Sequence, residues 1–193
     1  MSQNPSVPKS FWQGAAVRLR PFAPADAELI YAEQADSEAI RLLEAGQEAP
    51  RSVEQIRALI EKDIQQPPSN VMHFVVETMA GDAAGWVNLR DFQNRAGTFT
   101  FAVRIYQAYQ QRGYAADAVR ILLRLGFYEL RCQKCNSIVL EGNEASLRLH
   151  LKLGFREEGR LRRNVYSLGR YWDEICLGLT REEFDEMEQQ ASA

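Results

Sequence analysis

The spacing of apolar and polar residues divides this chain of 193 residues into alternating and amphipathic segments. Residues 16–21 alternate, which predicts a first strand, and Pro24-Ala25-Asp26 then opens a helix that runs to about Glu33. A second helix is expected from the capping-box sequence Ser52-Val53-Glu54-Gln55, with apolar residues on one face, until Pro67-Pro68 ends it.

Three strands are expected next, in an antiparallel meander over 71–78, 84–92 and 98–105. Gly81-Asp82 is a typical hairpin signal between the first two, and residues 94–97 make the second turn. Strands joined by such short turns pair with one another in one sheet.

The second half of the chain alternates helices and strands. A loop and a helix are expected over 106–130, a strand over 138–140 and a short helix over about 145–152. Two strands near 155–162 and 171–179 precede an acidic helical tail. The order β-α-α-β-β-β-α-β-α-β-β indicates a mixed α+β layer architecture.

The length and composition indicate one globular domain, which we expect over 15–187, with a flexible tail over 1–14 and a C-terminal tail over 188–193. No apolar run approaches the roughly 18 residues of a membrane span, and no apolar signal segment opens the chain, so the expected location is cytoplasmic with no membrane partner. A net charge of -3 argues against nucleic acid as a partner.

The three cysteines raise the question of a metal or redox site. Cys132-x-x-Cys135 has no second such pair and no nearby histidine to complete four ligands, so no metal site is expected. Two partly buried thiols are the alternative that this sequence favours.

The loop at residues 109–118 carries the most specific chemistry of the chain. An expected strand enters a loop that contains Gly113 and the small residue Ala115, and a helix follows. Such a loop directs several free backbone N–H groups at an anion, and glycine tolerates the positive φ that it often needs. The sequence fits neither a P-loop nor a dinucleotide-binding fingerprint.

Two motifs resemble those of the GNAT family of N-acetyltransferases. Gln110-x-x-Gly113-x-Ala115 is similar to the family's [QR]-x-x-G-x-[GA] signature. The segment 143–159 is similar to a second signature, N-x-x-S-x-x-x-Y-x-K-x-G-F-x-x-x-G, about thirty residues further on. The resemblance covers roughly 16 to 185, and Gly169-x-Tyr171-x-Asp173 places the chain near ribosomal-protein and polyamine N-acetyltransferases.

The resemblance implies the GNAT fold, with a mixed, mostly antiparallel central sheet flanked by helices and splayed between the fourth and fifth strands. It implies acetyl-CoA as co-substrate and direct attack by a primary amine, either a protein N-terminus or a small polyamine or aminoglycoside-like amine. A catalytically weak CoA-binding regulatory module of the same fold is the alternative. The C-terminal strands of such folds also allow a homodimer.

The resemblance assigns acetyl-CoA binding to the end of the fourth strand, the loop with the first helical turn, and three residues of the second motif. These are Val103, Ile105, Gln110, Gln111, Arg112, Gly113, Tyr114, Ala115, Ala116, Asn143, Ser146 and Lys152. The alternatives are a plain turn for the glycine, a plain helix cap for the asparagine and serine, and a solvated side chain for the lysine.

The catalytic assignment implied by the resemblance is His150, at the position of a tyrosine that protonates the CoA thiolate in the family. An imidazole with a pKa near 6.5 suits proton transfer near neutrality. The alternative is a histidine packed among leucines with one satisfied hydrogen bond. Many relatives carry a glutamate on the fourth strand, but residues 97–102 contain no carboxylate, so the amine's proton is expected to leave through water to Glu141 or to an acid of the first helices.

The segment from residue 24 to residue 63 contains ten acidic and four basic residues. In the family it frames the acceptor side, where an acidic lip would attract an amine. A solvated helix face is the alternative interpretation.

Overall fold

One seven-stranded sheet runs through the protein, and the computed structural model describes residues 10–46 and 49–191. The strands are β1 (Val17–Arg20), β2 (Val71–Thr78), β3 (Ala83–Gln93), β4 (Thr98–Ile105), β5 (Lys134–Leu140), β6 (Arg156–Ser167) and β7 (Arg170–Thr180). The helices are α1 (Ala27–Glu33), α2 (Ser37–Glu44), α3 (Val53–Gln65), α4 (Tyr114–Arg124), α5 (Glu144–Lys152) and α6 (Arg181–Ala191). Short turns η1 (Pro24–Asp26) and η2 (Gln107–Tyr109) precede α1 and α4, and the π-helical segment η3 (Leu125–Glu129) ends α4.

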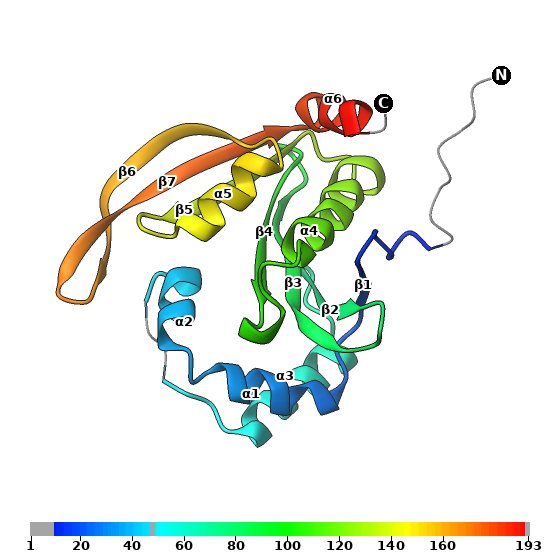
Figure 1. Cartoon of the computed structure of the whole chain (residues 1–193), viewed down its shortest axis with the longest axis vertical. Coiled ribbons are helices and arrows are strands. Elements are labelled where there is room, and N and C mark those ends of the chain that lie inside the picture. Colours follow the sequence, from blue (N-terminus) through cyan, green and yellow to red (C-terminus); the bar gives the residue numbers. More distant parts are fainter. Residues whose placement is uncertain (1–9, 47–48, 192–193) are drawn as a thin grey trace.

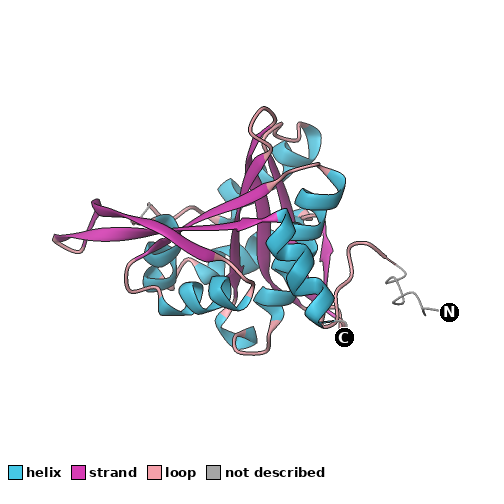
Figure 2. Ribbon diagram, turned by 90° about the horizontal axis from the view of Figure 1, so that it is seen from above, coloured by secondary structure: helices cyan, strands magenta, loops and turns pink. Residues whose placement is uncertain are grey.

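Helices lie on both faces of this sheet (Figure 1). The helices α4 and α5 cover one face, whereas α1 and α3 pack together on the other. The β6–β7 hairpin projects beyond the helices, as the view from above shows (Figure 2). Within the described residues, no helix has the length and apolar character needed to cross a membrane.

The strand order is β1-β2-β3-β4-β5-β7-β6, and every neighbouring pair is antiparallel except β4 and β5. The parallel pair is very short: it consists of Thr98 opposite Lys134 and Phe99 opposite Cys135. Beyond these residues the described parts of β4 and β5 separate. The predicted α+β class and the splay between the fourth and fifth strands are therefore confirmed.

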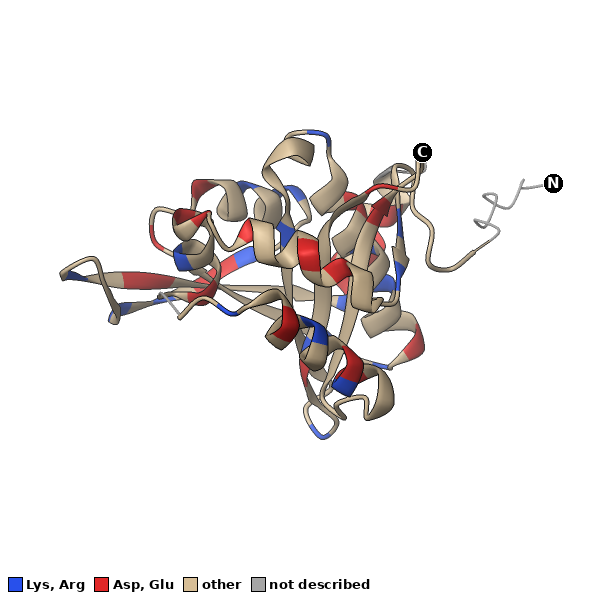
Figure 3. Ribbon diagram, turned by 90° about the horizontal axis from the view of Figure 1, so that it is seen from below, with Lys and Arg blue, Asp and Glu red and all other residues tan. Residues whose placement is uncertain are grey.

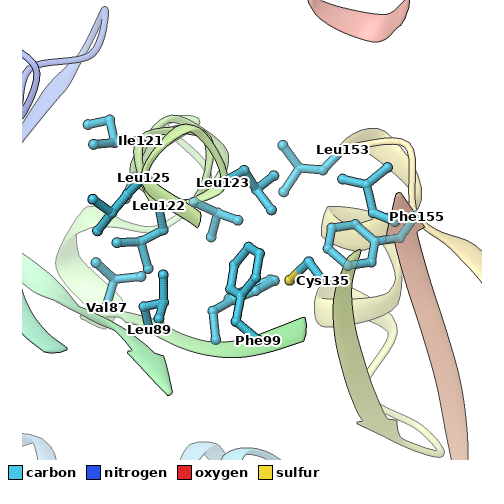
Figure 4. Packing of buried hydrophobic residues seen from close by; sticks show 14 of the residues in the cluster. Val87, Leu89, Phe99, Ile121, Leu122, Leu123, Leu125, Cys135, Leu153 and Phe155 are labelled. Atoms are coloured by element: carbon cyan, nitrogen blue, oxygen red, sulfur yellow. The ribbon is translucent and has the colours of Figure 1, made fainter. Parts of the chain in front are cut away.

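The main core lies between α4 and the sheet (Figure 4). Leu122 and Leu125 of α4 and η3 face Val87 and Leu89 of β3, and Phe99 lies beside Cys135 at the closed end of the splay. All of these side chains are buried. Packing of this kind fixes the closed end and leaves the rest of β4 free to diverge from β5.

Several boundaries differ from the sequence-based expectations. The strand expected over 138–140 begins at Lys134, because the buried Cys135 alternates with half-buried polar neighbours. The unexpected helix α2 is short and begins at Ser37, after the capping residue Asp36, whose carboxylate accepts the Ala39 N–H at 3.0 Å. The C-terminal tail expected over 188–193 is helical through Ala191.

The expected N-terminal tail also contains ordered contacts. Residues 1–9 lie outside the described part of the chain, but the Leu19 N–H donates to the Trp12 carbonyl at 2.8 Å. The Trp12 ring packs on Phe74 with 5.0 Å between ring centroids. Residues 10–14 therefore line the edge of the sheet beside β1.

We expect Gly126→Ala to lower the free energy of unfolding by about 1–3 kcal/mol, because overpacking forces buried side chains to move. A Cβ at Gly126 would stand 2.3–2.9 Å from ring atoms of Phe99. Urea denaturation measures the change. Gly159→Ala is the matched control, since a Cβ there meets nothing within 4 Å; an equal loss in both variants would contradict the explanation.

Candidate functional site

The separation of β4 from β5 leaves one edge of β4 facing a gap. The Tyr106 N–H donates to the Ala84 carbonyl of β3 at 2.9 Å. Because backbone groups of alternate residues point to alternate sides of a strand, those of Val103 and Ile105 point away from β3. The Gln110 amide confirms this direction, since it donates to the Ile105 carbonyl at 3.1 Å. The predicted N–H groups of the fourth strand thus lie on the gap side.

The loop before α4 forms an open cradle of backbone N–H groups. Gln111 (φ 61°) and Gly113 (φ 81°) both adopt the left-handed conformation, and α4 begins at the next residue, Tyr114. Left-handed residues next to a helix N-terminus direct successive N–H groups toward a common anion. A Cβ at Gly113 would meet nothing within 4 Å, so the backbone faces open space. The binding of an acetyl-CoA pyrophosphate by these residues stays a prediction.

Other side chains of this loop hold its shape. The Arg112 guanidinium donates to the Ala108 carbonyl at 3.0 Å and stacks on Tyr109, 5.6 Å from the ring centroid. Asp117, the acidic residue in the first turn of α4, accepts N–H bonds from Ala16 at 2.7 Å and from Val17 at 3.0 Å. Its charge is therefore directed at β1, away from the exposed loop.

The second motif is divided between the two ends of α5. The Asn143 side chain accepts the Ser146 N–H at 3.1 Å and donates to the Leu42 carbonyl of α2 at 3.3 Å, so it caps α5 and joins it to α2. Lys152 is exposed nine residues later, about 13 Å along the helix. The structure places Asn143 and Ser146 close together and Lys152 apart from them. Their roles in binding stay predictions.

His150 is buried between the diverging strands. Its ring stacks on Phe101 of β4, with centroids 5.2 Å apart, and its Nε2 lies 2.7 Å from the Ser137 hydroxyl of β5. The Nδ1 atom lies 2.8 Å from the Ser146 carbonyl, which only accepts, so Nδ1 carries the proton and Nε2 accepts from Ser137. Burial lowers the pKa of His150, although the bond to Ser146 opposes this effect.

These contacts use both ring nitrogens and favour a neutral imidazole. They match the alternative of a packed histidine, with two hydrogen-bond partners where one was expected. Proton donation from Nε2 would first require an imidazolium in a buried site, which burial disfavours. The role of His150 as an acid stays a prediction, and the observed contacts support a role in holding β4 against β5.

A cavity of about 1050 Å³ lies on the opposite face of the sheet. Residues of α1, α2 and α3 form its walls, and residues of β2, β3 and β4 line it from the sheet. Arg104, near the end of β4, donates to the Glu33 carbonyl at 2.7 Å and pairs with the Glu33 carboxylate at 3.3 Å. Burial, and then the charge of Glu33, raise the pKa of the neighbouring Tyr106 to about 12. The splayed strand therefore has polar groups in the cavity.

Four acids of the expected acidic lip have basic partners: Asp26, Glu28, Glu33 and Glu38. Asp26 pairs with Arg20 at 2.8 Å, and Glu28 pairs with Arg57. Both acidic and basic residues occur on the helices seen from below (Figure 3). Glu141, a proton acceptor that the sequence suggests, does not line the cavity; its carboxylate accepts the N–H of Asp173 in β7 at 3.4 Å.

Sequence reasoning missed the polar and aromatic residues that line the cavity from the sheet. Trp86 and Asn88 of β3 and Arg104 of β4 line the cavity, and the side-chain Oδ1 of Asn88 accepts the Ala102 N–H at 3.1 Å. Side chains along a strand alternate between the two faces of a sheet, so the sequence does place residues 86 and 88 on the same face. The alternation alone does not indicate which of the two faces borders a cavity.

Residues 16–156 match the Acetyltransferase (GNAT) domain family. The chain is also 32% identical over 176 residues to the SPbeta prophage-derived uncharacterized N-acetyltransferase YokL of Bacillus subtilis, with 91% of this chain and 96% of that protein covered. The chain belongs to the GNAT acetyltransferase family. Acetyl-CoA is the co-substrate of this family, and the open cradle before α4 remains the predicted position of its pyrophosphate.

Further relatives agree with this membership. The spermidine N(1)-acetyltransferase of Escherichia coli K12 is 28% identical over 169 residues, which cover 88% of each chain. The crystal structure of spermidine N-acetyltransferase from Vibrio cholerae, in complex with CoA and spermine, matches with a TM-score of 0.76 at 23% identity. That match covers 87% of this chain and 97% of the other, and it confirms the fold.

We expect His150→Phe to lower the free energy of unfolding by about 1–3 kcal/mol at neutral pH, because the buried Ser137 hydroxyl loses its acceptor. The wild-type protein should lose stability as pH falls below about 6.5, since the unfolded chain then binds a proton that the folded imidazole resists. The variant should lose less stability over this pH range. Urea denaturation at several pH values measures both effects.

The turnover of the same variant separates the two roles of His150. A kcat within about threefold of wild type supports packing, whereas a fall of about 10²–10⁴ with unchanged acetyl-CoA affinity supports the acid role. His150→Tyr should then restore much of the activity.

Proposed function

We propose that this acetyltransferase transfers the acetyl group of acetyl-CoA to a primary amine bound in the cavity between α1, α2, α3 and the sheet. One observation carries the proposal: beyond Phe99 the edge of β4 near the cradle pairs with no described strand, while Arg104 of β4 and Tyr106, which directly follows β4, line the cavity. The same strand therefore borders both the cofactor side and the acceptor side. The acceptor is either a small diffusible amine or a protein N-terminus.

Acetyl transfer requires the site to hold the cofactor, to stabilise the oxyanion and to remove a proton from the amine. Backbone N–H groups of residues 111–116 hold the pyrophosphate, and gap-facing N–H groups of Val103 and Ile105 provide donors for an oxyanion. Acetyl-CoA supplies the activated thioester when it is bound. An ammonium with a pKa near 10 must also lose a proton before it attacks.

The proton path in this proposal ends at Glu33. Glu33 lines the cavity and contacts β4 through Arg104, whereas Glu141 lies beside β7. A water chain from the amine to Glu33 would replace the strand carboxylate that residues 97–102 lack. The spermidine N-acetyltransferases of Escherichia coli and Vibrio cholerae, to which the chain is similar, support an amine as acceptor.

We expect Gly113→Trp to weaken acetyl-CoA binding at least about thirtyfold, because the indole would occupy the space in front of the N–H groups. Isothermal titration calorimetry with acetyl-CoA measures the affinity. Gly81→Trp is the matched control: Gly81 also has a positive φ of 98° and nothing within 4 Å of a Cβ, but it lies in the β2–β3 turn. Equal affinities of the two variants would contradict the position of the site.

We expect the wild-type protein to release CoA in the presence of a primary amine faster than by hydrolysis. A panel of spermidine, an aminoglycoside and short peptides with free N-termini tests small and protein-like acceptors. Release of free CoA is the measured quantity. Intact acetyl-CoA binding without turnover of any primary amine would favour the regulatory module instead.

A further inference from the structure

The cavity is lined mainly by apolar residues, although the segment around it is rich in acids. Ile56, Leu59 and Ile64 of α3, Ile30 of α1, and Met72 of β2 contribute to its wall, and Trp86 of β3 lines it from the sheet. We propose that the acceptor is a primary amine attached to an extended apolar body rather than a polycation. This inference rests on the proposed transfer to an amine and specifies its substrate class.

The first argument is the apolar surface that the folded chain leaves uncovered at this cavity. Leu59 is 46% exposed, Ile64 is 52% exposed and Met72 is 42% exposed. Large apolar groups that gather around one cavity mark a binding site, because a ligand that covers them removes apolar surface from water. The volume of about 1050 Å³ leaves room for a body the size of a drug molecule.

The second argument is charge. Among the described residues that line the cavity, three are carboxylates and three are guanidinium groups: Glu33, Glu44, Asp63, Arg51, Arg90 and Arg104. Desolvation lowers the pKa of His73; the charge of Asp63 opposes this effect and that of Arg90 adds to it, so the net shift favours the neutral imidazole. A polyamine with several ammonium groups therefore finds no excess of negative charge here.

The third argument is the separation of polar and apolar groups across the cavity. The Glu33–Arg104 pair lies at the end of β4, next to the gap. Met72 comes from β2, two strands away and so about 10 Å across the sheet. An amine directed at β4 would thus have its apolar body over β2 and α3.

A series of linear primary amines from n-butylamine to n-octylamine tests this proposal, with spermidine as the reference acceptor. We expect kcat/KM to rise about two- to fourfold with each added methylene until the cavity is filled, as burial of a methylene predicts. The value for n-octylamine should exceed that for spermidine. A flat series, or faster turnover of spermidine, would overturn the inference and leave the proposed function intact.

A pair of matched variants tests where the apolar body of the amine binds. Leu59→Asp places a charge in the apolar wall and should lower kcat/KM for n-octylamine at least about tenfold, with acetyl-CoA affinity unchanged within twofold. Leu29→Asp is the control, because Leu29 is 42% exposed on α1 and does not line the cavity. A loss of similar size in the control would overturn the position of the apolar body.

Calorimetric binding of n-octylamine separates failure of the inference from failure of the proposed function. Binding that Leu59→Asp weakens, without acetylation of any amine, would support the apolar site and overturn the transfer reaction. Acetylation of spermidine without measurable n-octylamine binding would overturn the apolar site alone. Loss of both binding and acetylation would overturn both.

Discussion

The parallel pairing of β4 with β5 extends over only two residue pairs among the described residues. The position of the candidate cofactor site depends on where this pairing ends. Thr98 and Phe99 pair with Lys134 and Cys135, and the strands then diverge within the described residues. A longer pairing would use the backbone groups of Val103 and Ile105 for the sheet. Because the pairing stops, those groups face a gap at the end of the sheet where the cradle begins.

Packing at the closed end of the gap keeps the divergence at a fixed position. The buried Phe99 ring lies against Gly126, where a larger residue would collide with it. His150 then bridges the strands just beyond the last pair, through its stacking on Phe101 and its hydrogen bond with Ser137. The gap is thus maintained by a well-packed core on one side of the sheet. The opposite face of β4 remains available to line the cavity.

The sequence predicted the features that depend on residues close together in the chain. The cradle at 109–116 is one example, because a glycine next to a helix start determines the local backbone. The capping box at Ser52 and the hairpin at Gly81 are further examples, and the structure contains both. The order of the elements then indicated the sheet.

The features that the sequence did not predict depend on residues far apart in the chain. Arg104 lies 71 residues after Glu33 in the chain and pairs with its carboxylate. This pairing neutralises one of the acidic charges counted between residues 24 and 63. His150 finds Ser137 on another element, so its second partner was not visible from its leucine neighbours. The apolar cavity wall combines residues of three helices and two strands. The alternation of side chains along a strand does not show which helix packs against each face of the sheet.

Hydrogen exchange of backbone amides with and without CoA tests most directly whether the gap and the cradle form the cofactor site. We expect bound CoA to slow exchange at Val103 and Ile105 and over residues 111–116, because these N–H groups acquire acceptors or lose access to water. The β2–β3 turn at residues 79–82 should exchange at an unchanged rate. Tight CoA binding that leaves exchange at β4 and the cradle unchanged would contradict this assignment.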